Sequence, residues 1–160
     1  MTGSGRRIRS IFRGTMGSPP SEPGRWELFE HDADIGIRAE SPSRECLFEL
    51  MGEALTAVVT SPAEVEPRTE LTIRCNAPDD TMLLFDWLNA LIYEMATRHM
   101  LFGAWKVRLD GQELDARVSG EAVDRERHQP AVEIKGATYT DLEVERNAVG
   151  LWRAQCIVDV

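Results

Sequence analysis

The chain has 160 residues, which is enough for one domain with a sizeable buried core. Its composition, 42% hydrophobic and 28% charged, is typical of a globular protein rather than a disordered one. No apolar run approaches the roughly 18 residues that a membrane helix needs. The net charge of −9 disfavours direct binding to nucleic acid and favours cations or a basic protein surface as partners.

The first 24 residues differ in composition from the rest of the chain. They hold four arginines and one glutamate, which gives a charge of +3. Because the whole chain has a charge of −9, residues 25–160 carry −12. The segment is rich in Gly, Ser and Pro and has no sustained apolar period. We therefore expect residues 1–24 to form a disordered basic tail and residues 25–160 to form the folded domain. Translation from Met16 and an organelle-targeting signal are the alternatives for this segment.

Hydrophobic periodicity predicts two long helices. Ser41 followed by Pro42 suggests an N-cap and a first helical position, so the first helix is expected over residues 42–59. Asp79 or Asp80 caps the second helix, whose wide apolar stripe is the strongest signal in the chain and which ends near His99.

Alternating apolar and polar residues predict strands along the remainder of the domain. The dipeptide Asp110-Gly111 lies between two such runs and predicts a hairpin. The fold class is therefore α+β, with two main helices packed on a mostly antiparallel sheet. The expected strands cover residues 35–40, 71–75, 105–109, 114–118, 132–134, 142–144 and 152–158.

The cysteines and the missing motifs narrow the function. Cys46, Cys75 and Cys156 give an odd count without Cys-x-x-Cys spacing, so we expect buried, reduced cysteines in a cytoplasmic protein. The sequence has no Gly-rich phosphate loop, nucleophile elbow, zinc helix or dinucleotide fingerprint. A stand-alone catalyst is therefore not expected.

Carboxylates at both ends of the domain are the candidate ligands for a cation. Asp34 begins a predicted strand, and Asp32 has the same parity in the extended segment. Asp159 stands beside the terminal carboxylate of Val160. Oxygen ligands of this kind suit Ca²⁺ or Mg²⁺. Spacing alone does not bring the two ends together, and solvated surface acids are the other interpretation.

Three further features have two interpretations each. His31 and His128 are candidate bases or metal ligands, or else structural histidines that form hydrogen bonds. Asp86, Asn89 and Tyr93 share one edge of the second helix. That edge is either a solvated surface or a place where a partner docks.

Taken in order, four motifs resemble the archease family over about residues 25–160. They are His31–Gly36, Leu83–Asn89, His128–Tyr139 and Asp159–Val160. The resemblance implies an α+β sandwich built on a strand–helix–strand–strand module. It also implies a non-catalytic activator of the GTP-dependent RNA ligase of tRNA splicing, which promotes ligase guanylylation and multiple turnover.

The resemblance also implies a metal site formed by Asp34, Asp159 and Val160, with Ca²⁺ as the first choice and Mn²⁺ or Mg²⁺ as alternatives. Asp32 is not carried over, and Ala131 and Gly136 depart from the family pattern. The expected partner is the ligase, without direct nucleic-acid or membrane binding. The main alternative is a chaperone or regulator of a tRNA or DNA methyltransferase, and a metal-dependent hydrolase ranks third.

Overall fold

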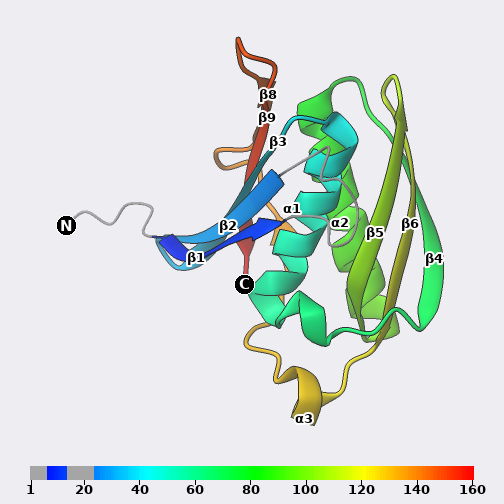
Figure 1. The fold of residues 1–160 in the computed structure, drawn as a ribbon. Coiled ribbons are helices and arrows are strands. Elements are labelled where there is room, and N and C mark those ends of the chain that lie inside the picture. Colours follow the sequence, from blue (N-terminus) through cyan, green and yellow to red (C-terminus); the bar gives the residue numbers. More distant parts are fainter. Residues whose placement is uncertain (1–6, 14–23) are drawn as a thin grey trace.

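Two β-sheets enclose two long helices in the computed structural model, which describes residues 7–13 and 24–160 (Figure 1). The larger, six-stranded sheet has the order β1-β2-β3-β9-β7, with β8 also paired to β9, and the smaller has the order β4-β6-β5. The strands of the larger sheet are β1 (Arg7–Arg13), β2 (Gly24–His31), β3 (Asp34–Ser41), β7 (Gly136–Ala137), β8 (Glu143–Arg146) and β9 (Trp152–Asp159). Those of the smaller sheet are β4 (Thr69–Asn76), β5 (Met100–Asp110) and β6 (Glu113–Ala122).

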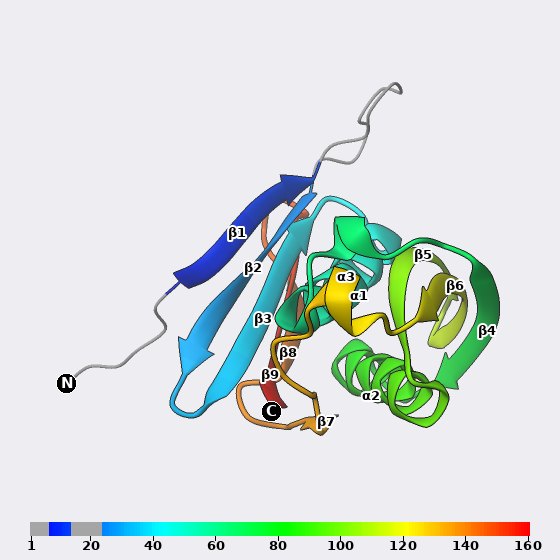
Figure 2. The ribbon, with the colours of Figure 1, turned by 90° about the horizontal axis from the view of Figure 1, so that it is seen from below.

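The long helices are α1 (Arg44–Val59) and α2 (Asp80–Arg98), and the short ones are the 3₁₀ helix η1 (Pro62–Glu64) and α3 (Arg125–His128). All strand pairs are antiparallel. The expected α+β class is therefore confirmed. The strands form two sheets with the helices between them, a division that the periodicity of the sequence did not specify (Figure 2).

Helix α1 lies between the two sheets and has little solvent-facing surface. It contacts β2 and β3 on one side and β5 on the other, and twelve of its sixteen residues are buried. A helix that is apolar on most sides is stable only when it is covered on most sides. The contact with β5 is close, because a Cβ at Gly52 would lie 2.8 Å from the indole ring of Trp105.

Helix α1 begins at Arg44 rather than at residue 42. Its N-cap is Ser43, whose side chain accepts a hydrogen bond from the amide of Cys46 at 3.0 Å. The expected cap, Ser41, instead accepts from the amide of Ser43 and remains the last residue of β3. A hydroxyl at position 43 satisfies a free amide of the first helical turn, which explains the shift.

Helix α2 and the following hairpin agree closely with the prediction. Asp79 caps α2 by accepting from the amide of Met82 at 2.8 Å. His99 ends the helix with a left-handed φ of 52°. In the hairpin Asp110 pairs with Glu113, so the turn residues are Gly111 and Gln112, one position later than expected. Gly111 has a φ of 61°, a conformation that glycine adopts without strain.

Residues 132–134 were expected to form a strand, and that prediction is wrong. The amide of Ala131 donates to the carbonyl of Val59, and the amide of Lys135 donates to the carbonyl of Asp159. The chain therefore crosses from the end of α1 to β9 and forms only the two-residue strand β7, just after the expected position. Strand β2 and helix α3 were not predicted from the sequence either.

Residues 7–13, within the segment expected to be a basic tail, form β1. This strand pairs with β2, whose outer edge would otherwise carry unpaired backbone groups. The rest of the predicted tail, residues 1–6 and 14–23, lies outside the described residues. In the described part of the chain, no helix has the length and apolar character required to cross a membrane.

Candidate metal site at the end of the six-stranded sheet

The motif that begins at His31 forms the turn between β2 and β3. His31 pairs with Asp34 across a two-residue connection. Asp32 has a φ of 53°, a conformation that aspartate tolerates better than most residues, and its side chain is 95% exposed. The turn therefore accounts for Asp32, and only Asp34 of the two acids lies in a strand.

Asp34 and Asp159 occupy facing positions on neighbouring strands. Ile35 pairs with Val158, so Asp34 and Asp159 stand at the next position of the same antiparallel register. On its other side Asp159 pairs with Gly136 of β7. Side chains alternate between the faces of a sheet, so both carboxylates belong to the face turned away from the helices. The fold thus brings together the two ends of the domain, a placement that spacing alone could not establish.

A further acid, Asp141, lies close to His31, the residue that pairs with Asp34. Asp141 was not singled out from the sequence. Nε2 of His31 lies 3.5 Å from a carboxylate oxygen of Asp141, and Nδ1 lies 3.9 Å from Asp32. Asp141 has a φ of 51°, and its carbonyl accepts from the amide side chain of Gln155. The only sequence signal for this contact is an aspartate in a short polar segment before β8.

A buried apolar row separates these carboxylates from the remainder of the outer face. The ring of Phe29 lies directly over Gly36, where an added Cβ would be 2.1 Å from the ring. Ile157 completes the row, and the guanidinium of Arg38 stacks on Phe29 at 3.9 Å. The site therefore has an apolar boundary on its inner side.

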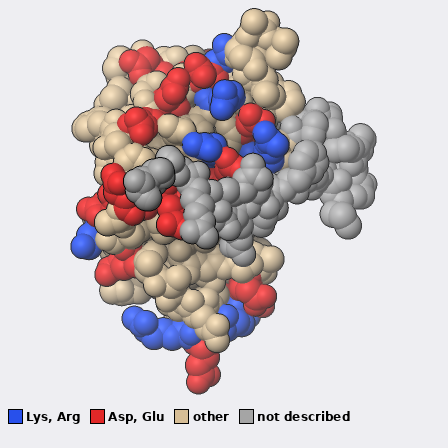
Figure 3. All heavy atoms as spheres, turned by 90° about the vertical axis from the view of Figure 1, so that its left-hand side faces the viewer, with Lys and Arg blue, Asp and Glu red and all other residues tan. Residues whose placement is uncertain are grey.

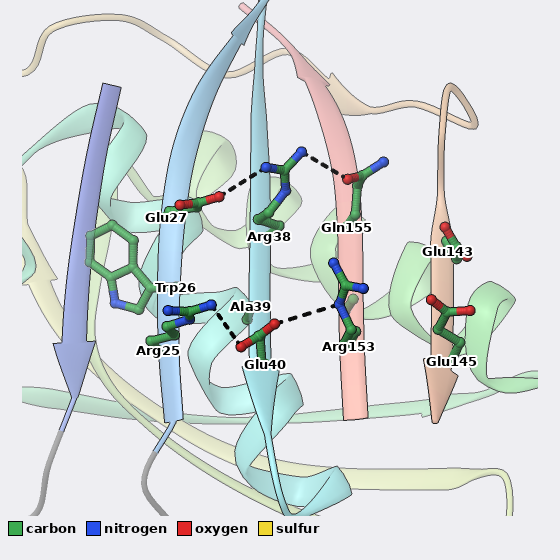
Figure 4. Close-up of a pocket in the computed structure, with 11 residues that line it drawn as sticks. Arg25, Trp26, Glu27, Arg38, Ala39, Glu40, Glu143, Glu145, Arg153 and Gln155 are labelled. Carbon is green, nitrogen blue, oxygen red and sulfur yellow. Dashed lines mark hydrogen bonds and ion pairs between the residues drawn. The ribbon is translucent and has the colours of Figure 1, made fainter. Parts of the chain in front are cut away.

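Beyond the apolar row the outer face carries paired charges (Figure 4). Arg38 donates to Glu27 at 2.9 Å and to Gln155 at 3.2 Å. Glu40 lies between Arg25 at 3.0 Å and Arg153 at 3.6 Å. Acidic and basic side chains accordingly lie interspersed on this face (Figure 3). The small hollow at this face is lined by these paired groups and also by Glu143 and Glu145 of β8.

The candidate donors at the strand ends are the side chains of Asp34 and Asp159 and the carboxylate of Val160. Within residues 7–13 and 24–160, no three His, Cys, Asp or Glu side chains are grouped closely enough to hold a metal ion. Asp159 is exposed, while Asp34 and Val160 are partly buried. The main chain of Asp159 is fixed, because its carbonyl accepts from the amide of Lys135 at 2.7 Å. An ion held here would need the terminal carboxylate and water as well as Asp34 and Asp159.

His128 is structural rather than a candidate base. Its Nδ1 accepts from the amide of Asp124 at 2.8 Å, so Nε2 carries the proton and donates to Glu121 at 3.0 Å. Arg127 donates two hydrogen bonds to the same carboxylate. The hydrogen bonds from Arg127 hold the pKa of Glu121 well below its usual range, although burial acts in the opposite direction. Hydrogen bonds from the Glu66 amide and from His128 lower this pKa further.

The cysteines agree in part with expectation. All three are thiols outside any disulfide; Cys46 and Cys156 are buried, but Cys75 is only partly buried. Burial raises the pKa of the Cys156 thiol to about 11. Burial, with a contribution from Asp86, does the same for Cys75. These thiols stay protonated near neutral pH and are poor metal ligands.

The fold and its strand end define a class: a small α+β protein with two sheets around two helices and facing acids at the end of the larger sheet. The chain belongs to the archease family, because the Archease protein family model matches residues 26–160.

Relatives and a solved structure agree with that assignment. The archease proteins of Pyrococcus furiosus and Methanosarcina mazei are each 34% identical to this chain. Their alignments cover 85% and 88% of this chain and 99% of each relative. Protein 1598 of Methanobacterium thermoautotrophicum, solved in solution, is 28% identical with a TM-score of 0.69. That match covers 84% of this chain and 98% of the other.

Proposed function

We propose that this protein is a non-catalytic, metal-binding activator of the GTP-dependent RNA ligase of tRNA splicing in the cytoplasm. It promotes guanylylation of the ligase and multiple turnover. Membership of the archease family supports the role. The observation that carries the metal site is the register that sets Asp34 opposite Asp159 beside the chain end.

The donor set suits a hard divalent cation. Asp34, Asp159 and the carboxylate of Val160 supply only oxygen ligands, which favours Ca²⁺, with Mn²⁺ and Mg²⁺ as alternatives. Three carboxylates that each bind through one oxygen supply about three of the roughly 6–8 ligands of Ca²⁺, and water completes the shell. A bound ion would supply positive charge at the end of the sheet, together with water ligands that can be exchanged for other ligands. Asp34 and Asp159 bind it from neighbouring strands, and the Lys135 amide holds the main chain of Asp159 in place.

Electrostatic attraction would favour the encounter between this protein and the ligase. Residues 25–160 carry a formal charge of −12, derived from the sequence total of −9 and the +3 of the first 24 residues. A ligase that binds RNA, GTP and divalent ions presents a cationic pocket. An acidic strand end is attracted to such a pocket, and opposite charge accelerates the encounter. The same acidity disfavours direct contact with the RNA backbone.

A guanylylation assay tests this function. Substoichiometric protein is added to the cognate ligase with GTP, and both GMP loading and multiple-turnover RNA ligation are followed. We expect both to rise. No change in either step would refute ligase activation. Recovery of a methyltransferase instead of the ligase in a pull-down would favour the alternative role.

A further inference from the structure

One edge of α2 contacts the segment that carries β7. The Oδ1 atom of Asn89 accepts a hydrogen bond from the amide of Ala137 at 3.0 Å. One helical turn earlier, the ring of Phe85 stacks on Tyr139 with centroids 4.2 Å apart and planes inclined by 12°. Asn89, on the edge that the sequence left between a solvated surface and a docking site, therefore makes a specific contact inside the molecule.

The segment held by α2 also holds the end of β9. Asp159 pairs with Gly136, and its carbonyl accepts from Lys135. The carbonyl of Ile157 accepts from both the amide and the hydroxyl of Thr138, at 3.0 and 2.9 Å. Strand β7 thus lies between α2 and the end of β9 (Figure 2).

Two residues of pairing are too few to hold a strand in place by themselves. The contacts from α2 supply the missing support. Asn89 has a lower helix propensity than most residues, and its side chain occupies a helix edge where hydrogen bonding to β7 replaces hydrogen bonding to water. Tyr139 is 65% exposed, so its stack on Phe85 fixes a direction for the chain more than it buries surface.

We infer that Asn89 and Phe85 are positioning residues for the strand end at Asp159. They fix β7, β7 fixes the main chain of Asp159, and the directions of the Asp159 side chain and the Val160 carboxylate follow. Helix α2 thereby supports the carboxylates from behind, as residues that orient metal ligands do. The inference rests on the proposed metal site for its functional meaning but not for its structural test.

Four variants test the inference. Asn89→Leu keeps the approximate volume and removes the acceptor, whereas Asn89→Asp keeps an acceptor oxygen. Tyr139→Ser removes the stack at an exposed position, so it leaves the fold intact. Gly136→Ala is the matched control within β7, since the one heavy atom within 4 Å of an added Cβ there is Asn89 Oδ1 at 3.7 Å.

Amide hydrogen exchange and Ca²⁺ calorimetry give the two readouts. In Asn89→Leu and Tyr139→Ser we expect the Lys135 and Thr138 amides to exchange about tenfold faster. We expect Ca²⁺ affinity to fall at least about tenfold, the size of effect seen when residues that orient metal ligands are lost. Asn89→Asp and Gly136→Ala should resemble the wild type in both readouts.

The outcomes separate this inference from the proposed function. Unchanged exchange in Asn89→Leu and Tyr139→Ser would overturn the inference, as would faster exchange with unchanged Ca²⁺ affinity. If the wild type binds neither Ca²⁺ nor Mn²⁺, the proposed metal site fails, and amide exchange alone decides whether Asn89 and Phe85 fix the main chain of Asp159. If the wild type binds an ion but does not activate the ligase, only the partner assignment fails.

Discussion

The imidazole Nε2 of His128 lies 3.0 Å from Oε2 of Glu121, and both side chains are almost completely buried. Glu121 is at the end of β6 and also accepts from the amide of Glu66, after η1. One carboxylate therefore ties together β6, α3 and the chain that precedes β4. Removing it leaves several donors without a partner.

We predict that Glu121→Gln lowers the free energy of unfolding by about 2 kcal/mol at pH 7, since charged hydrogen bonds of this kind contribute that much. The measurement is denaturant unfolding of both proteins. Glu126→Gln, at an exposed position in the same short helix, is the control and should change stability by less than about 0.5 kcal/mol. Equal stability of the Glu121 variant and the wild type would contradict the role given to this network.

The same carboxylate predicts a pH dependence. Its pKa in the folded state is lowered, chiefly by Arg127. A lowered pKa contributes stability above the unfolded value of about 4.3 and loses it as pH falls toward the folded value. Below about pH 4.3 the wild type should therefore lose stability more steeply than Glu121→Gln, by about 1.4 kcal/mol per pH unit. Parallel curves from unfolding experiments at stepped pH would show that the carboxylate does not titrate this way.

Asp34→Asn and Asp159→Asn should each weaken Ca²⁺ and Mn²⁺ binding and ligase activation together. Each amide keeps the shape of the side chain and removes one ionised ligand. Calorimetry measures the affinity, and thermal melts should confirm that the fold is intact. Asp32→Asn is the matched control, because its side chain is 95% exposed in the adjacent turn. If all three variants bind ions equally well, Asp34 and Asp159 are ordinary surface acids.

Adding Gly-Ser after Val160 should impair metal binding and activation. The extension replaces an ionised oxygen with a neutral amide and crowds Asp159, which follows the last pair of β9 with β3. The same extension placed before Met1 should have no effect on either measurement. Equal behaviour of the two tagged proteins would exclude the terminal carboxylate from the site and leave Asp34 and Asp159.

Deleting residues 1–23 should leave metal binding and ligase activation unchanged and shift the melting temperature by less than about 4 °C, which corresponds to about 1 kcal/mol. Strand β1 occupies the edge of the sheet opposite β7, and the family match begins only at residue 26. Deleting residues 1–6 spares β1 and serves as the control. A much larger loss of stability from the longer deletion alone would show that β1 is an integral part of the sheet.

Elements whose signals lie close together in the sequence were mostly predicted correctly. The apolar stripe of α2, its Asp79 cap and the Asp110–Gly111 hairpin are all encoded within a few residues of sequence. The prediction of a strand over residues 132–134 was wrong because alternation at Val132 and Ile134 indicates burial but does not indicate a hydrogen-bonded partner strand. The division into two sheets depends on long-range pairing, which no local period encodes.

The candidate site was predictable only as separate parts. Asp34 and Asp159 were identified from the sequence as possible ligands. Only the family resemblance implied that they share one site, and the β3–β9 register places them opposite each other. The contacts of Asp141 with His31 and of Asn89 with Ala137 were not predicted. Each depends on how a short loop crosses a strand end or a helix, and such crossings are set by tertiary packing rather than by local sequence.

The pairing of β3 with β9 also governs how the chain folds. Arg38 and Gln155 form a hydrogen bond although 117 positions separate them in the sequence. Closing a loop of that length costs more chain entropy than forming α1 or the β5–β6 hairpin, so contacts of this kind form late in folding. We therefore expect the facing carboxylates to come together only as the last barrier is crossed. An early intermediate would have its helices and its smaller sheet in place but no assembled acidic strand end.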